Sequence, residues 1–278
     1  MKGEHPIRML CELLKVSHSG YYRWCQQRPS TRQCEDAAIA AKVAAAHRAS
    51  RGTYGAPRIL VDLQEGGTRT SKRRCARLMR EQGLHGKKKH RRKPRTTDSR
   101  HAKPVAENII ALRPDPTGPN QCWLTDITYI QTAEGWLYLA AILDLWSRRI
   151  VGWSCGATLH ASLVLAALHD ALKRRNPPKG LLHHSDRGSQ YVDEDYIKAL
   201  IAAGIERSMS RAGNCYDNAA MESFWSTLKQ ELIYRRHFKT RDEARQAIFD
   251  FIEVFYNRQR LHSSLDYRSP LDFETQNN

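Results

Sequence analysis

The amino-acid sequence predicts an α/β fold, in which strands and helices alternate, preceded by a small all-helical region. Stretches typical of strands begin only after Gln121, where Thr, Ile, Tyr and Trp are frequent. Before that point the patterns are helical. After it they follow the order strand, strand, strand, helix, strand, helix, strand, helix, helix. The charge of the chain changes at the same place, which supports a division into two kinds of domain.

The net charge is distributed very unevenly along the chain. Residues 1–118 contain 26 Lys and Arg but 10 Asp and Glu, whereas residues 119–278 contain 19 of each. The formal net charge of +16 therefore belongs entirely to the N-terminal part. This asymmetry predicts a polyanion-binding region beside a neutral domain. The alternative is a basic surface that is simply solvated.

The composition argues against several classes of protein. No apolar run approaches the roughly 18 residues needed to cross a membrane, and the N-terminus lacks the pattern of a signal peptide. The seven cysteines are scattered and include no CxxC pair. They indicate neither a zinc ribbon nor a disulfide framework. We therefore expect a cytoplasmic protein with reduced thiols.

The helical region begins with the outline of a helix-turn-helix. Two short helices are expected within residues 5–27, on either side of the turn VSHSG. An alanine-rich stretch, residues 34–50, is strongly helical. A shorter helix is expected within residues 57–67, where a pair of glycines closes it.

The next helix, within residues 70–84, carries the most concentrated positive charge. Thr70 or Ser71 is suited to cap its first turn. One face is apolar, and the rest of the surface is basic. A basic helix after a glycine turn is typical of major-groove recognition, while the alternative is an ordinary charged surface helix. The candidate DNA-binding residues here are Lys72, Arg73, Arg74 and Arg77.

Residues 86–118 are expected to form a basic linker. Its first part, GKKKHRRKPRTTDSRHAKP, is too polar to pack into a core. We interpret it as a segment lying on nucleic-acid phosphates, with a purely solvated tether as the alternative. The candidate contact residues are Lys87, Lys88, Lys89, Arg91, Arg92 and Lys93. The predicted domains are thus a helix-turn-helix region at 1–85, the linker at 86–118 and an α/β domain at 119–278.

The α/β domain is predicted to contain five strands and four helices. Strands are expected at 121–132, twice within 135–156, at 180–186 and at 206–210. Helices are expected at 160–175, 193–205, 218–234 and 240–260. In the last helix the apolar residues are placed to face inward, and they are Ala247, Ile248, Phe251, Ile252 and Phe255.

Three carboxylates stand out in these stretches. Asp126 lies inside the first strand, where an unpaired buried carboxylate is costly. Asp186 ends the fourth strand, a common place both for catalytic residues and for a turn-forming Asp. Glu222 lies in the first turns of the helix at 218–234. Another acid, Asp144, sits in an apolar run and is either a structural hydrogen-bonding group or a support for the site.

This pattern resembles that of retroviral integrases and their transposase relatives. In that family an Asp in the first strand and an Asp after the fourth are followed, after 35 intervening residues, by a Glu on a helix, and Asp186 and Glu222 have this spacing. Lys229, seven residues after Glu222, would share its helical face, where the family uses a basic residue to contact DNA. The runs HHSDRGSQY, SRAGNCYDNAAMESFWSTLKQE and YNRQRLHSSLDYRSPLDF resemble bacterial insertion-sequence transposases. The chain resembles the second-reading-frame product, often called OrfB, of a group that uses two overlapping frames.

The resemblance implies an RNase H-like mixed five-stranded sheet flanked by helices. It also implies that Asp126, Asp186 and Glu222 are catalytic and hold two Mg²⁺ or Mn²⁺ ions, with Asp126 bridging both. Carboxylate oxygens suit these hard cations. A pair of cations neutralises the attacking and leaving oxygens of phosphoryl transfer.

The expected function is a DDE-type transposase that nicks DNA at the ends of an insertion sequence and joins the exposed 3′-hydroxyl to another strand. Expected partners are the element ends, target DNA, the first-frame product as fusion or partner, and further copies of the chain on DNA, with no membrane involved. The expected location is the bacterial cytoplasm, on the nucleoid. Retroviral integrases begin with a zinc-binding His/His/Cys/Cys domain whose spacing is missing here, so we expect a zinc-free helical module.

Two alternatives remain open at the level of the sequence. One is a DNA-binding component or regulator that is inactive without its first-frame partner. The other is a metal-dependent nuclease that hydrolyses DNA without joining strands.

Overall fold

The computed structural model describes residues 6–26, 29–87, 106–210 and 218–277. Its contacts divide the chain into two compact units, Met1–Gly86 and Lys87–Asn278. The predicted linker at 86–118 falls largely outside the described residues. Within the described part, no helix is both long and apolar enough to cross a membrane.

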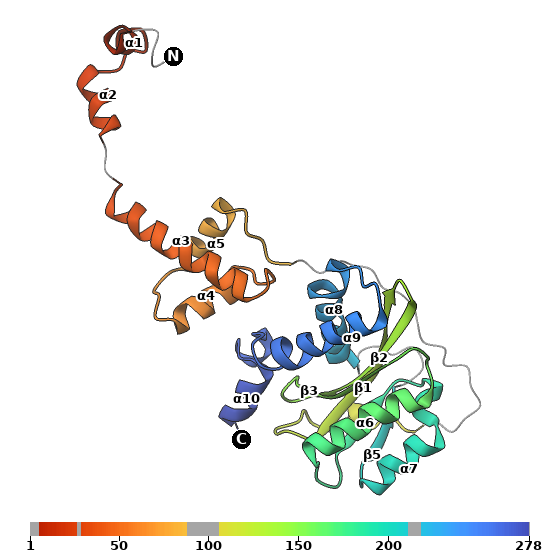
Figure 1. Cartoon of the computed structure of the whole chain (residues 1–278). Coiled ribbons are helices and arrows are strands. Elements are labelled where there is room, and N and C mark those ends of the chain that lie inside the picture. Colours follow the sequence, from red (N-terminus) through yellow and green to blue (C-terminus); the bar gives the residue numbers. More distant parts are fainter. Residues whose placement is uncertain (1–5, 27–28, 88–105, 211–217, 278) are drawn as a thin grey trace. The chain divides into compact units, whose positions relative to one another are not determined.

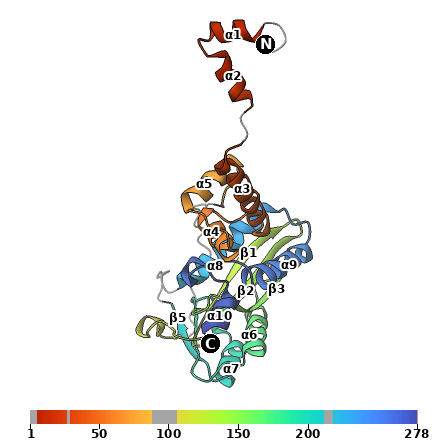
Figure 2. The same ribbon diagram turned by 90° about the vertical axis from the view of Figure 1, so that its left-hand side faces the viewer.

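The first unit is entirely helical in its described residues. Three helices form a small bundle, which both views show (Figures 1 and 2). The helices of the unit are α1 (Ile7–Leu13), α2 (His18–Cys25), α3 (Thr31–Ala49), α4 (Ala56–Glu65) and α5 (Lys72–Glu81), of which the last three make the bundle. The pair α1 and α2 has the predicted helix-turn-helix outline.

Helix α5 confirms the predicted amphipathic pattern. Ser71 caps it by accepting a hydrogen bond from the backbone N–H of Arg74 at 3.2 Å. Cys75, Leu78 and Met79 are all buried, because residues three and four apart share one face of a helix. This face packs against α3 and α4.

The second unit is built on a mixed five-stranded sheet in the order β3-β2-β1-β4-β5. The strands are β1 (Cys122–Thr132), β2 (Gly135–Asp144), β3 (Ile150–Gly156), β4 (Leu182–Ser185) and β5 (Glu206–Met209). The first three are antiparallel neighbours, whereas β4 runs parallel to β1 and β5 runs parallel to β4. This arrangement confirms the expected RNase H-like sheet.

Helices flank the sheet in the expected order. They are α6 (Ala161–Arg175), α7 (Glu194–Ala202), α8 (Ala219–Glu231), α9 (Arg241–Phe249) and α10 (Pro270–Asn277). Short 3₁₀ turns occupy Ile110–Leu112, Ser189–Val192, Ile233–Arg235 and Ser263–Leu265. Helices α6 and α7 pack with the sheet into one hydrophobic core, while α8 and α9 contact β1 (Figure 1).

Two features of the helices were not predicted. The expected helix at 240–260 is α-helical only to Phe249 and continues as a π-helix, Asp250–Tyr256. All five apolar residues expected to face inward are nevertheless buried. Helix α10 is the other addition. Few apolar residues mark it, and only Pro270 and Glu274 are buried in it.

Helix α6 lies unusually close to the sheet because β3 has a glycine where they meet. A Cβ atom at Gly152 would stand 2.4 Å from the carbonyl oxygen of Ala167. No real Cβ tolerates such a contact with backbone, so any side chain at this position would push the helix away.

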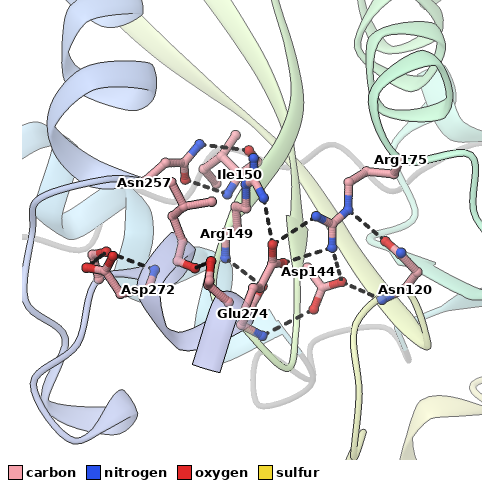
Figure 3. Close-up of polar contacts among 12 residues, drawn as sticks. Asn120, Asp144, Arg149, Ile150, Arg175, Asn257, Asp272 and Glu274 are labelled. Carbon is pink, nitrogen blue, oxygen red and sulfur yellow. Dashed lines mark hydrogen bonds and ion pairs between the residues drawn. The ribbon is translucent and has the colours of Figure 1, made fainter. Parts of the chain in front are cut away.

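A buried ionic network attaches α10 to the sheet (Figure 3). The Glu274 carboxylate accepts hydrogen bonds from the guanidinium groups of Arg149 at 2.6 Å and Arg175 at 2.8 and 2.9 Å. Asp144 accepts from the backbone N–H groups of Asn120 and Trp146. Asp144 is therefore a structural hydrogen-bonding group that shapes the β2–β3 turn.

The C-terminal part of the unit is tied down at two further points. The side-chain amide of Asn257 forms two hydrogen bonds with the backbone of Ile150, at 2.9 and 3.0 Å. It thereby satisfies backbone groups of the edge strand β3 that have no strand neighbour on that side in the described part of the chain. Arg260 forms a two-pronged ion pair with Glu231 at the end of α8, at 2.7 and 2.8 Å. The block YNRQR therefore has a structural role in holding α8.

Candidate active site

The pairing of β1 with β4 brings two of the predicted carboxylates to the same place. Trp123 is opposite His183, and Leu124 is opposite His184, so paired residues differ by 60 in number. Asp126 and Asp186 differ by the same 60, two positions further along the same register. Parallel strands keep their register, so the two side chains come out at adjacent positions where β4 has just ended.

The loop that carries Asp186 is shaped around its carboxylate. The backbone N–H of Gly188 donates to Asp186 Oδ1 at 2.9 Å. A Cβ at Gly188 would lie 3.0 Å from the same oxygen and 2.9 Å from the side chain of Gln190. The glycine therefore lets backbone approach the carboxylate closely.

Helix α8 reaches Asp126 through a tryptophan. The indole Nε1–H of Trp225 donates to Asp126 Oδ2 at 2.9 Å, and Trp225 is itself buried. The other oxygen, Oδ1, accepts from the backbone N–H of Ile127 at 2.7 Å. Trp225 was not among the site residues predicted from the sequence; its spacing of three residues from Glu222 was the available signal.

The pKa of Asp126 is shifted by its burial and by several neighbouring groups. Burial, and after it the negative charge of Asp186, raise the pKa of the Asp126 carboxyl, which ends at about 7. The hydrogen bonds from Ile127 and Trp225 and the positive charge of Lys229 act in the opposite direction. Burial lowers the pKa of Lys229, and Asp126 opposes that shift. The Lys229 ammonium thus lies within electrostatic reach of Asp126.

Glu222 stands apart from the two aspartates. It is exposed in the first turn of α8, three residues before Trp225 and seven before Lys229. These spacings place all three on one side of the helix. Among the residues that the structure describes, however, no three His, Cys, Asp or Glu side chains are close enough together to hold a metal ion.

The donor atoms nevertheless suit a divalent cation. Asp126 and Asp186 are adjacent, and the negative charge of Asp186 disfavours ionisation of Asp126, a conflict that a bound cation would relieve. Oxygen ligands of this kind are what Mg²⁺ and Mn²⁺ prefer. The structure thus brings two of the three predicted ligands together and leaves the third on the adjacent helix face.

The two histidines before Asp186, His183 and His184, are buried and form hydrogen bonds with hydroxyl groups outside the candidate site. Nε2 of His183 lies 3.1 Å from the hydroxyl of Tyr196. The two ring nitrogens of His184 lie 2.9 Å from the hydroxyls of Ser208 and Ser210. Both imidazoles therefore serve the packing between β4, β5 and α7.

The predicted DNA-binding residues of α5 fall into two groups. Lys72 and Arg73 are exposed and form no ion pair within the described residues. Arg74 and Arg77 are both bound to the carboxylate of Asp36 on α3, each at 2.6 Å. The sequence analysis did not anticipate this pairing.

The remaining predicted contacts belong to the linker. Lys87 is exposed. The other candidates, Lys88, Lys89, Arg91, Arg92 and Lys93, lie outside the described residues.

The mixed five-stranded sheet with its flanking helices is the fold of an integrase-type catalytic core, a class of enzymes that cut and join DNA. Two family models of the integrase core domain match residues 116–215 and 203–270, and a model of an HTH-like domain matches residues 33–93. The chain is 47% identical over 264 residues to the insertion element IS600 uncharacterized 31 kDa protein of Shigella sonnei, covering 95% of this chain and 97% of that protein.

A named transposase matches over the whole chain. Transposase InsF for insertion sequence IS3A of Escherichia coli (strain K12) is 42% identical over 278 residues, covering 99% of this chain and 96% of InsF. The protein therefore belongs to the IS3 family of insertion-sequence transposases. Among solved structures, the intasome of simian T-cell lymphotropic virus contains a similar chain, with 14% identity, a TM-score of 0.49 and coverage of 84% and 74% of the two chains.

Proposed function

We propose that this transposase uses DDE chemistry: Asp126, Asp186 and Glu222 hold two Mg²⁺ or Mn²⁺ ions and catalyse 3′-end nicking and strand transfer at the ends of its insertion sequence. The observation that carries the proposal is the shared register of β1 and β4, which puts Asp126 beside Asp186. When bound, the ions would neutralise the attacking and leaving oxygens and activate a water or a 3′-hydroxyl.

The residues of the proposed site have separate tasks. Asp126 and Asp186 supply ligands from the sheet, where backbone pairing fixes their spacing. Glu222 supplies the third ligand from α8 and completes the group when DNA and metal bind. Lys229, on the same helix face, neutralises a phosphate next to the reacting one. No covalent enzyme intermediate is required.

DNA is held by the basic region in the same proposal. Lys72 and Arg73 contact DNA from α5, and Lys87 with the basic residues that follow it contacts phosphates from the linker. Because Arg74 and Arg77 already share the Asp36 carboxylate, we assign them chiefly to holding α5 against α3. The predicted division at 1–85, 86–118 and 119–278 then separates DNA binding from chemistry.

The proposal also assigns partners to the enzyme. Two element ends must be held together for transposition, so a dimer or higher assembly forms on DNA. The first-frame product takes part as fusion or partner. The enzyme works in the bacterial cytoplasm, on the nucleoid.

A strand-joining assay tests the chemistry. The substrate is a labelled duplex that ends in the terminal repeat of the element and carries a free 3′-hydroxyl, incubated with Mg²⁺ or Mn²⁺. We expect joined product from the wild type and none from Asp126→Asn or Glu222→Gln, while both variants still bind the duplex. Glu194→Gln, an exposed carboxylate on α7, is the matched control and should join normally.

The alternatives give different results in the same assay. Hydrolysis without joining would identify a nuclease. Binding without either reaction by the wild type, with activity restored by adding the first-frame product, would identify a component that is inactive alone. Full activity of Asp126→Asn would exclude the proposed site.

A further inference from the structure

The stretch that follows α8 is one of two equally basic stretches in the described part of the second unit, the other being residues 172–181. Residues 232–241, LIYRRHFKTR, contain four Lys and Arg and no Asp or Glu. They lie within residues 119–278, which carry 19 residues of each charge and are neutral overall. We call residues 232–241 the basic segment. Its cations are Arg235, Arg236, Lys239 and Arg241.

The basic segment is held firmly against the β1–β2 hairpin. Phe238 is buried and pairs with Thr132, and the backbone N–H of Ala133 donates to the Phe238 carbonyl at 3.0 Å. Arg241 donates from its backbone N–H to Glu134 at 2.8 Å and from Nε to the Trp136 carbonyl at 3.0 Å. The segment is therefore a fixed surface and needs little ordering when a ligand binds.

Its outward side is chemically suited to a nucleic acid. Residues 234–237 are all exposed, and Tyr234 keeps 64% of its surface accessible. Arg236 and Lys239 form no ion pair within the described residues, so their charges are available to an outside anion. Cations combined with an accessible aromatic ring are the usual composition of a surface that follows a nucleic-acid strand.

Other basic clusters of the same unit do not have this character. Arg174 and Arg175 at the end of α6 are bound to the carboxylates of Asp170, Glu253 and Glu274. Their charge is already neutralised inside the protein. Lys173 and Lys179 of that cluster are exposed, but residues 172–181 contain no aromatic residue to accompany them.

The position of the segment relates it to the candidate active site. It begins where α8 ends, ten residues after Glu222, and it pairs with the last residue of β1, six residues after Asp126. At about 1.5 Å per helical residue and 3.3 Å per strand residue, it lies roughly 15–20 Å from these carboxylates. Duplex DNA rises about 3.4 Å per base pair, so this distance corresponds to roughly 4 to 6 base pairs.

We propose that the basic segment binds the phosphate backbone of the DNA about 4 to 6 nucleotides from the reacting 3′ end. Arg236 and Lys239 neutralise phosphates there, and Tyr234 packs against the sugar or an exposed base. This inference rests on the proposed function for its choice of DNA as ligand. It adds a contact surface on the catalytic unit itself, separate from α5 and the linker.

The first test measures charge neutralisation with the full chain. Binding of the element-end duplex is followed by fluorescence anisotropy between 50 and 200 mM salt. Each neutralised phosphate contributes about 0.9 to the slope of log affinity against log salt. We expect Arg236→Ala/Lys239→Ala to reduce the magnitude of that slope by about 1.8. Lys173→Ala/Lys179→Ala, which removes two exposed cations of the same unit, should leave it unchanged.

The second test locates the contact. Single phosphates are replaced by uncharged methylphosphonates along the duplex. Replacement at about 4 to 6 nucleotides from the 3′ end should weaken binding by the wild type but cause no further loss in Arg236→Ala/Lys239→Ala. Replacements at distant positions should affect both proteins equally.

The outcomes separate this inference from the proposed chemistry. An unchanged salt slope and equal losses at every position would overturn the inference, even if the wild type joins strands. A reduced slope with a local loss would support the inference, even if strand joining is absent. A thermal midpoint equal to that of the wild type checks that the variant is folded.

Discussion

Trp225 on α8 donates its indole N–H to the carboxylate of Asp126 on β1, at 2.9 Å and across 99 residues of sequence. This hydrogen bond links the two elements that carry the first and third predicted catalytic carboxylates. It orients one oxygen of Asp126. It also holds the face of α8 that bears Glu222 and Lys229 toward the sheet.

Removing this hydrogen bond should impair catalysis without unfolding the protein. Trp225→Phe keeps an aromatic ring in the buried position but has no N–H. Partners that orient metal-binding carboxylates typically contribute about 10–100-fold to metal affinity or activity. We expect strand joining to fall by about that factor and to require more Mn²⁺ for half-maximal rate. Mn²⁺ binding followed by paramagnetic relaxation of water gives a readout that is independent of activity.

A matched control exists on the edge strand β3. Trp153 donates its indole N–H to Glu253 at 2.8 Å, away from the site. Trp153→Phe removes a bond of the same kind and should leave the Mn²⁺ dependence unchanged. If both variants shift the Mn²⁺ dependence equally, the effect of Trp225 is one of general stability.

The two groups of cations on α5 should respond differently to substitution. Lys72→Ala/Arg73→Ala should weaken DNA binding and reduce the magnitude of the salt slope by about 1.8, with an unchanged thermal midpoint. Asp36→Asn should lower the thermal midpoint, because Arg74 and Arg77 lose their shared partner. Equal losses of DNA binding and stability in both variants would contradict this division.

The buried carboxylate of α10 should contribute strongly to stability. Burial alone would raise the pKa of Glu274, but hydrogen bonds from Arg175 and Arg149 outweigh it and lower that pKa. Glu274→Ala leaves both guanidinium groups without this partner. Breaking a buried pair costs about 3–5 kcal/mol. We expect about 3 kcal/mol of lost unfolding free energy, the lower end, because the Arg149 side chain is 30% exposed.

Urea denaturation of the second unit measures this loss. The control is Arg245→Ala, which breaks an exposed ion pair with Asp242 on α9. Such surface pairs contribute about 0–1 kcal/mol. A loss for Glu274→Ala no larger than that for Arg245→Ala would show that α10 is only loosely attached.

His183 should make the protein sensitive to mild acid. Burial, together with the charges of His184 and Arg207, lowers the pKa of His183 from 6.5 to about 3. The unfolded state therefore binds the proton more readily, and stability falls as the pH drops below 6.5 toward 3. Between pH 7.5 and pH 5 the expected loss from this group is about 2 kcal/mol.

His183→Gln isolates this contribution, because Gln can still reach the Tyr196 hydroxyl but does not titrate in this range. The variant should lose about 2 kcal/mol less than the wild type between the two pH values in urea denaturation. His169→Gln, on the exposed side of α6, should behave like the wild type. Identical pH dependence of His183→Gln and wild type would show that His183 accepts its proton in the folded state.

Much of the fold could be predicted because it depends on near neighbours in the sequence. The strand at 121–132 and the amphipathic helix at 72–81 follow from side-chain periods of two and of three to four residues. The π-helical continuation of α9 could not be predicted, because its five inward residues are compatible with either helix. Helix α10 was missed because its buried anchor is a charged residue, Glu274, which carries no apolar signal.

The sequence by itself determined the family, the succession of strands and helices along the chain, and the spacing of Asp126, Asp186 and Glu222. Only the tertiary structure decided which charged side chains form ion pairs within the protein. Arg73 and Arg74 are neighbours of the same type, yet one is exposed and the other is bound to Asp36, 38 residues away. The sequence gives the sign of each charge, but packing between elements that are distant in the sequence decides which group it binds. The hydrogen bond between Trp225 and Asp126 depends on such packing in the same way.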